Sequence, residues 1–88
     1  MSPLTLRFLI RSGCRLCDEA RPLVARAARR AGAKLEEIDI ERDDDLLQRF
    51  HLRIPVLLGP GGEVVAEGVI DDLRTLSRTL RRLKKGRG

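Results

Sequence analysis

The order in which strand-like and helix-like patterns follow one another constrains the fold of this chain most strongly. Residues 4–10 form a short, mostly apolar run that ends at Ser12-Gly13, and the apolar residues of segment 14–31 recur at helical spacing. Residues 35–40 alternate apolar and charged side chains, which is typical of a strand. A strand–helix–strand start requires two parallel strands joined by a right-handed crossover.

The second half of the chain predicts a helix, a β-hairpin and a final helix. We expect, in order, a short helix that starts within 43–45 and ends at His51, strands at 53–58 and 63–66, and a helix that starts near Asp71 or Asp72. The glycine-rich segment 59–62 is a tight connection, so the last two strands pair antiparallel. The predicted order is β-α-β-α-β-β-α, an α/β fold with a single four-stranded mixed sheet flanked by helices.

The size of the chain leaves room for one domain. Its 88 residues cannot hold a second core of useful size, so we expect a single domain over residues 1–84 and a basic tail over residues 85–88. No apolar run approaches the roughly 18 residues of a membrane helix, and Arg7 and Arg11 interrupt the apolar stretch that a signal peptide would need. We therefore expect a cytoplasmic protein that has no membrane partner.

The positive charge of the chain is concentrated at its C-terminal end. The net charge is +5, but residues 74–88 hold seven cations and no acid, which leaves −2 on residues 1–73. The basic segment is either a solvated helix face or a surface for an anionic partner. The two Phe are the only aromatic residues that could stack on bases, so we expect no nucleic-acid partner.

Cys14 and Cys17 are the residues best suited to carry chemistry. The chain reaches Cys14 from a strand through Gly13, and a helix is predicted to begin there. The free N–H groups of the first helical turn and the positive end of the helix dipole stabilise a thiolate, which lowers the pKa of Cys14. Arg11 and Arg15 could add to this effect. Cys17 shares the helix face of Cys14 and can attack a mixed disulfide formed there.

A Cys-x-x-Cys pair is also half of a zinc site. Zinc requires four ligands, and this chain contains two cysteines and one histidine, so a site within the chain would need a carboxylate. A structural disulfide does not suit the reducing compartment that we expect. We therefore predict catalytic cysteines and no metal site.

Two motifs occur together in this chain. One is the segment 12–20, Ser-Gly-Cys-Arg-Leu-Cys-Asp-Glu-Ala, and the other is Ile54-Pro55 at the start of a predicted strand, with Pro22 inside the first helix. In this combination the sequence resembles small glutaredoxin-like proteins of the thioredoxin-like superfamily, over residues 4 to about 84. The resemblance implies a thioredoxin-like fold and a thiol–disulfide oxidoreductase in which Cys14 attacks a disulfide and Cys17 resolves the intermediate.

The resemblance also implies which residues meet the substrate: Arg11, Arg15, Leu16, Arg53, Ile54 and Pro55. Ile54-Pro55 would be a cis bond packed against the cysteine pair, with the backbone of Ile54 free to pair with an extended substrate, and an ordinary trans proline is the alternative. Arg11 takes the position of a basic residue that contacts the glutathione carboxylate, and Arg53 could meet a substrate carboxylate. Either could instead be a solvated cation.

The chain departs from glutaredoxins in two places. The cysteine pair encloses no aromatic residue, and Glu67-Gly68 replaces a Gly-Gly pair that precedes an acidic residue. Asp71 or Asp72 is therefore more simply a helix N-cap than a contact for glutathione.

We expect no bound cofactor, with glutathione as a candidate co-substrate and a reductase as the other electron donor. The expected partner of this monomer is a disulfide-containing protein or a glutathione mixed disulfide. The alternative function is that of a non-catalytic thioredoxin-fold adaptor, which docks an acidic partner through its basic C-terminal helix.

Overall fold

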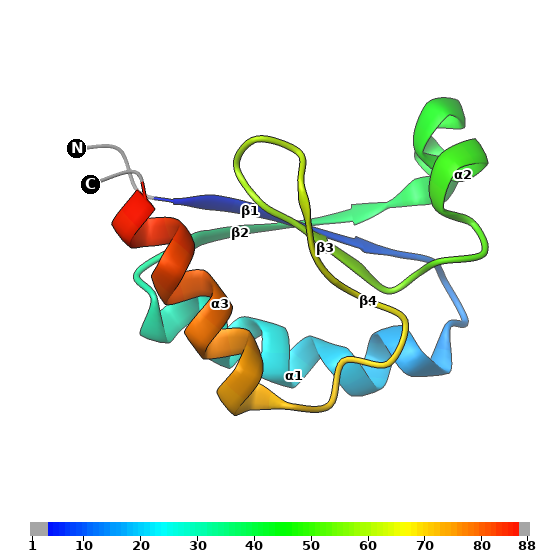
Figure 1. Cartoon of the computed structure of the whole chain (residues 1–88). Helices are drawn as coiled ribbons and strands as arrows, with labels where there is room; N and C mark the ends of the chain where they lie inside the picture. The colour runs from blue at the N-terminus through cyan, green and yellow to red at the C-terminus, as the bar shows by residue number, and fades with distance from the viewer. Residues whose placement is uncertain (1–3, 87–88) are drawn as a thin grey trace.

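The computed structural model describes residues 4–86 of the chain. Within this range it contains four strands, three α-helices and one short 3-10 helix (Figure 1). In chain order these are β1 (Thr5–Ile10), α1 (Arg15–Arg30), β2 (Lys34–Asp39), η1 (Ile40–Arg42), α2 (Asp44–Phe50), β3 (Val56–Leu58), β4 (Val64–Glu67) and α3 (Leu73–Gly86). The predicted α/β order is confirmed.

The four strands form one mixed sheet in the order β2-β1-β3-β4. β1 runs parallel to β2 and antiparallel to β3, and β3 and β4 form an antiparallel hairpin. Leu9 pairs with Ile38 on one side and with Val56 on the other. This register places the carboxyl end of β1 beside the start of β3.

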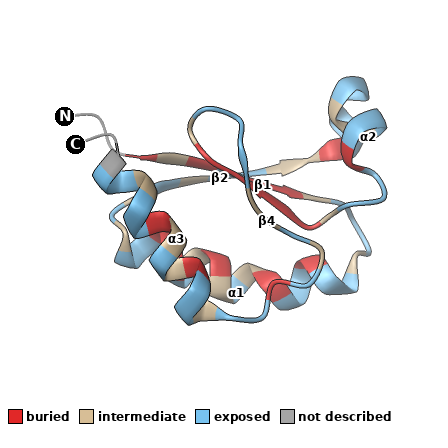
Figure 2. Cartoon of the chain, in the orientation of Figure 1, coloured by how far each residue is buried: buried red, intermediate tan, exposed pale blue. Residues whose placement is uncertain are grey.

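The helices cover the two faces of the sheet unequally. α1 and α3 pack side by side on one face, and the shorter α2 lies on the other (Figure 1). Successive residues of a strand point to opposite faces, so Phe8 faces α1 and α3 while Leu9 faces α2. Buried residues therefore gather on the sheet and on the helix sides that face it (Figure 2).

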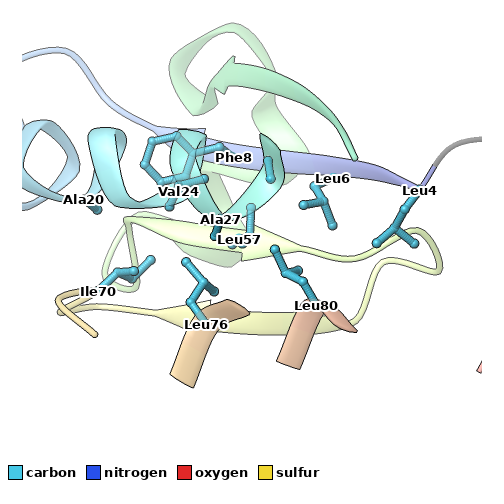
Figure 3. Close-up of a cluster of buried hydrophobic side chains, with 11 residues drawn as sticks. Leu4, Leu6, Phe8, Ala20, Val24, Ala27, Leu57, Ile70, Leu76 and Leu80 are labelled. Atoms are coloured by element: carbon cyan, nitrogen blue, oxygen red, sulfur yellow. The ribbon is translucent and has the colours of Figure 1, made fainter. Parts of the chain in front are cut away.

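The larger core lies between the sheet and the pair of long helices. Figure 3 shows its side chains turned toward one another from β1, β3, α1 and α3. The buried members are Leu4, Leu6, Phe8, Ala20, Val24, Ala27, Ala28, Leu57, Ile70, Leu76 and Leu80. The small side chains of the alanines in α1 allow the helix to pack closely against the sheet and α3.

β3 is shorter than the strand predicted at 53–58. The chain forms a turn over residues 51–53, and the N–H groups of Arg53 and Ile54 both donate to the carbonyl oxygen of Phe50, at 2.8 and 3.1 Å. Pro55 has no N–H to give to a ladder. The strand therefore begins at Val56, where the first free N–H becomes available.

The basic end of the chain continues α3. The helix includes Lys85 and Gly86, so the predicted boundary at residue 84 falls inside it, and residues 87–88 of the predicted tail lie outside the described residues. In the part of the chain that the structure describes, no helix combines the length and the apolar character needed to cross a bilayer.

Candidate functional site

A short turn carries the chain from the sheet to the cysteine pair. β1 ends at Ile10, and the N–H of Cys14 donates to the carbonyl oxygen of Arg11 at 3.2 Å. Gly13 has a φ of +78°, a conformation that is strained for a residue with a Cβ. The glycine therefore allows the turn that brings Cys14 to the start of α1.

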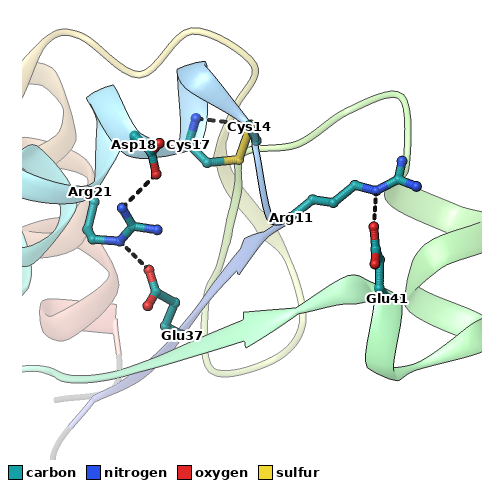
Figure 4. Close-up of a disulfide and its surroundings, with 7 residues drawn as sticks. All are labelled: Arg11, Cys14, Cys17, Asp18, Arg21, Glu37 and Glu41. Carbon is teal, nitrogen blue, oxygen red and sulfur yellow. Dashed lines mark hydrogen bonds and ion pairs between the residues drawn. A yellow bond between two sulfur atoms is a disulfide. The ribbon is translucent and has the colours of Figure 1, made fainter.

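Cys14 is the N-cap of α1. Its backbone is extended, with φ −88° and ψ 108°, and its Sγ accepts a hydrogen bond from the backbone N–H of Cys17 at 3.1 Å (Figure 4). This is the position in which Ser or Asp side chains cap a helix by accepting from the free amides of the first turn. A sulfur atom therefore occupies the place where the helix stabilises negative charge.

The two cysteines are joined by a disulfide, with their Cα atoms 5.2 Å apart. Cys17 is completely buried, and it lies one turn before the buried Ala20 on the core-facing side of α1. Cys14 is half-buried and lies at the edge of that core. A reactant arriving from solvent therefore meets the sulfur of Cys14 and not that of Cys17.

Pro55 lies at the same end of the sheet as the cysteine pair. The bond between Ile54 and Pro55 is cis, and Val56 directly after it pairs with Leu9 at the end of β1. Pro55 is buried, and its carbonyl oxygen accepts a hydrogen bond from Gly68 at 2.8 Å. The β1 end, the start of β3 and the residue after β4 thus converge around one buried proline.

The backbone of Ile54 is only partly available to a substrate. Its N–H donates to Phe50 in the turn, which leaves the carbonyl as the group that an extended chain could pair with. The side chain of Ile54 is half-buried against the smaller core between the sheet and α2. Because both the side chain and the N–H are held by the fold, this segment has a fixed shape.

The three arginines predicted to meet the substrate each contact a carboxylate. The pairs are Arg11–Glu41 at 2.6 Å, Arg15–Glu19 at 3.2 Å and Arg53–Glu67 at 2.5 Å. Arg11 extends away from the disulfide toward Glu41 (Figure 4). The guanidinium of Arg53 also lies 5.0 Å from the ring centroid of Phe50. The charge around the site is therefore locally balanced.

Residues 5–81 match the family described as Glutaredoxin-like domain (DUF836). The chain belongs to this family. Among curated proteins, none matches the chain.

Solved structures show the same architecture as this glutaredoxin-like domain. A structural genomics target protein from X. campestris is 32% identical, with a TM-score of 0.65 over 92% of this chain and 96% of that chain. A mutant thioredoxin from Halobacterium salinarum NRC-1 is 25% identical, with a TM-score of 0.66 over 92% of this chain and 74% of that chain. A protein from Nitrosomonas europaea is 25% identical, with a TM-score of 0.65 over 76% of this chain and 80% of that chain. The predicted thioredoxin-like fold is confirmed.

Sequence reasoning missed a three-residue ion cluster beside the cysteines of this glutaredoxin-like domain. Arg21 donates to Asp18 at 2.9 Å and to Glu37 at 2.5 Å (Figure 4). The hydrogen bond with Glu37, followed by that with Asp18, raises the pKa of Arg21. The cluster ties the first two turns of α1 to β2. The spacing of Asp18 and Arg21 on one helix face could have predicted their contact from the sequence. The contact with Glu37 could not be predicted without knowing how β2 lies against α1.

Exposed apolar side chains occur on the segments that form the site. Leu16, inside the cysteine pair, is 41% exposed, Leu52 in the turn before Pro55 is 87% exposed and Val69, next to Gly68, is 63% exposed. Of these, only Leu16 was predicted to contact a substrate.

No cluster suited to a metal ion occurs within residues 4–86, where no three Cys, His, Asp or Glu side chains converge. His51 caps the end of α2, and its Nδ1 lies 3.0 Å from the carbonyl oxygen of Leu47. The histidine is therefore engaged at the helix end.

Proposed function

We propose that this glutaredoxin-like domain is a thiol–disulfide oxidoreductase that uses Cys14 as the nucleophile and Cys17 as the resolving cysteine. The observation that supports this most directly is the unequal placement of the two linked sulfurs. Cys14 is half-buried at the helix cap, where its Sγ accepts a hydrogen bond, and Cys17 is completely buried behind it. This asymmetry supports Cys14 as the nucleophile and Cys17 as the resolving cysteine.

The reaction begins from the reduced pair. The thiolate of Cys14 attacks one sulfur of a substrate disulfide, a new Cys14–substrate bond forms, and the other substrate sulfur leaves as a thiolate. Cys17 then loses its proton and attacks the sulfur of Cys14, which forms the intramolecular disulfide and releases the second substrate thiol. The substrate disulfide has gained two electrons from the cysteine pair, and its two sulfurs take one proton from Cys17 and one from solvent.

The helix cap favours the first step. In the reduced form the amide that now donates to the Sγ of Cys14 is available to a thiolate, and the dipole of the 16-residue helix adds to it. We expect a pKa for Cys14 below the ordinary value of about 8.5. The contribution comes from backbone groups, because Arg11 and Arg15 are each paired with a glutamate.

Two thiols regenerate the enzyme by the reverse chemistry. Glutathione is one candidate donor, and a dithiol of a separate reductase is the other. For Arg11 to hold the glutathione carboxylate, its contact with Glu41 must open or be shared. The exposed side chains of Leu16, Leu52 and Val69 offer apolar contacts to an extended peptide beside Pro55. These contacts favour a protein disulfide as the substrate.

A reduction assay tests this assignment. Purified protein is incubated with insulin or with a glutathione mixed disulfide, and either glutathione or a flavin-linked dithiol reductase supplies electrons. We expect turnover by the native chain, none by Cys14→Ser, and accumulation of a covalent mixed disulfide by Cys17→Ser, detected by intact-protein mass spectrometry.

The two serine variants serve as matched controls, because each removes one sulfur and leaves the other. Circular dichroism verifies that both retain the fold. Full activity in Cys14→Ser, or trapping through Cys17 instead of Cys14, would contradict the assigned roles.

A further inference from the structure

A small groove lies between α1 and α3, away from the cysteine pair. It has a volume of about 130 Å³ and is lined by Ala27, Arg30, Ala31, Ser77, Arg81 and Lys84. Arg30 is 16 residues after Cys14, which corresponds to about 24 Å along a helix. The groove is therefore separate from the redox site.

Three cations line this groove, and none of them has a carboxylate partner within residues 4–86. The ion pairs of the described residues all involve arginines elsewhere: Arg11, Arg15, Arg21, Arg49 and Arg53. Lys84 donates through its Nζ to the carbonyl oxygen of Ala31 at 3.0 Å. An ammonium group has three donors, so Lys84 is held at the groove with donors to spare.

The negative ends of the two helix dipoles offset only part of the positive charge in the groove. α1 and α3 both end on this side of the molecule, as Figure 1 shows, and each C-terminus carries about half a negative charge. Arg30, Arg81 and Lys84 together exceed that charge, and Arg29 and Lys85 lie in the last turns of the same two helices. The groove therefore keeps an excess of positive charge.

The unpaired hydroxyl of Ser77 is a second, independent sign that the groove binds a ligand. Its Oγ is buried and has no hydrogen-bond partner among the described residues. Buried hydroxyl groups are normally hydrogen-bonded, because an unpaired one loses its interaction with water without replacement. Ser77 lines the groove, so a rotation of its side chain would bring this hydroxyl to the acceptor oxygens of a ligand there.

We propose that this groove binds one phosphate group, either as the free ion or as the monoester end of a larger molecule. Two guanidinium groups from facing helices present forks of N–H donors that match phosphate oxygens, and an ammonium and a hydroxyl complete the set. The volume suits a single tetrahedral oxyanion rather than a whole nucleotide. The proposal does not depend on the redox chemistry.

Titration of the 15N-labelled protein with inorganic phosphate, at constant ionic strength maintained with NaCl, tests this site by NMR. We expect saturable shifts confined to the amides around Ala27, Ser77 and Arg81. Arg81→Ala should raise the Kd about tenfold, because it removes a charge-assisted contact. Ser77→Ala should raise it less, and it should not lower the melting temperature of the ligand-free protein, since it removes an unpaired hydroxyl.

Arg82→Ala is the matched control. It removes the same charge from the next residue of α3, which does not line the groove, and the Kd should stay within about twofold of the native value. Equal weakening by Arg81→Ala and Arg82→Ala would overturn the proposal, because it would indicate diffuse attraction to a basic helix. Shifts that do not saturate would overturn it as well.

A second titration identifies the source of the phosphate group. Glycerol 3-phosphate is compared with inorganic phosphate under the same conditions. Tighter binding of the ester supports a phosphorylated molecule as the ligand, and equal or weaker binding supports the free ion. Failure of both to shift the groove amides would reject the site.

Discussion

The two ends of α1 differ in how their charged residues are arranged. At the N-terminal end, Arg11 and Arg15, which lie on either side of Cys14 in the sequence, are each paired with a glutamate. At the C-terminal end, Arg30 faces Arg81 and Lys84 of α3, and no carboxylate contacts any of the three within residues 4–86. One end is locally neutral, and the other holds an excess of cations.

This difference means that electrostatic fields of two kinds act at the two ends of the same helix. Backbone amides at the N-terminus are fixed in direction, they do not titrate and they act over a few ångströms. Long cationic side chains act over greater distances and are screened by salt, with a Debye length of about 10 Å at 0.1 M. The redox chemistry should therefore respond weakly to ionic strength, and the basic groove should respond strongly.

A pair of variants should separate the two ends. Cys14→Ser removes the nucleophile and should lower disulfide reduction at least about a thousandfold, while phosphate binding by the reduced native chain and by the variant remains the same. Arg81→Ala should weaken phosphate binding and leave disulfide reduction unchanged. Turnover assays measure the reduction rate of both variants, and NMR titrations measure their affinity for phosphate. A loss of phosphate affinity in Cys14→Ser would show that the ends are coupled.

Salt should stabilise the fold through the basic end. Raising NaCl from about 0.02 to 0.5 M screens the repulsion among unpaired cations, and we expect the melting temperature to rise by a few degrees. The apparent pKa of Cys14, measured by the pH dependence of alkylation, should stay nearly unchanged. An Arg81→Ala, Arg82→Ala double variant should show a smaller thermal response. An equally large rise in the melting temperature of the double variant would show that the repulsion does not come from Arg81 and Arg82.

Releasing a cation near the disulfide should have a modest effect. Glu41→Gln leaves Arg11 unpaired, and we expect the apparent pKa of Cys14 to fall slightly, because exposed charges interact weakly through water. Arg11→Gln removes a cation that is already balanced and should change this pKa less. Alkylation rates across pH, compared among the three proteins, report both. A larger shift in Arg11→Gln would mean that the guanidinium, rather than the helix cap, stabilises the thiolate.

The smallest expected effect is a pH-dependent change in melting temperature when the N-cap of α3 is removed. Asp72 accepts hydrogen bonds from the backbone N–H and the hydroxyl of Thr75, at 3.1 and 2.8 Å, and these bonds, the backbone one first, hold its pKa below the ordinary value of 3.8. Its stabilisation is complete above pH 3.8 and is lost as the pH falls through the lower folded-state pKa. Asp72→Ala should lower the melting temperature at pH 7, and the difference should disappear in acid.

The exposed neighbour Asp71 provides the control for this pH dependence, because its carboxylate accepts no hydrogen bond within the described residues. Asp71→Ala should leave the melting temperature nearly unchanged at both pH values. Equal destabilisation by the two variants would show that the negative charge, rather than the cap, supports the helix.

The fold was largely predictable because its signals are local. The alternation across residues 35–40, the helical spacing after Cys14 and the glycines of the hairpin each depend on a few neighbouring residues. The strand order follows from the right-handed crossover. The start of β3 was predicted too early, because the turn that removes the N–H groups of Arg53 and Ile54 is invisible to hydrophobic patterning.

A site could be predicted from the sequence only where all its residues lie in one short segment. Cys14 and Cys17 share a single turn of helix, so their cap geometry could be anticipated from spacing. The contact of Arg21 with Glu37 depends on how α1 sits against β2. The groove combines Arg30 with Arg81, which are 51 residues apart in the sequence, and its shape is decided by how the two helices pack.

The complete burial of Cys17 has a consequence for what becomes of the covalent intermediate. Once a substrate is attached to Cys14, competing thiols in the surroundings can approach only from the open side of that bond. Cys17 attacks from the buried side of the same molecule, so its rate of attack does not depend on the concentration of the protein. In the proposed reaction, release of product therefore depends on the two sulfurs of the first helical turn, and an oxidant that arrives from solvent meets Cys14 before Cys17.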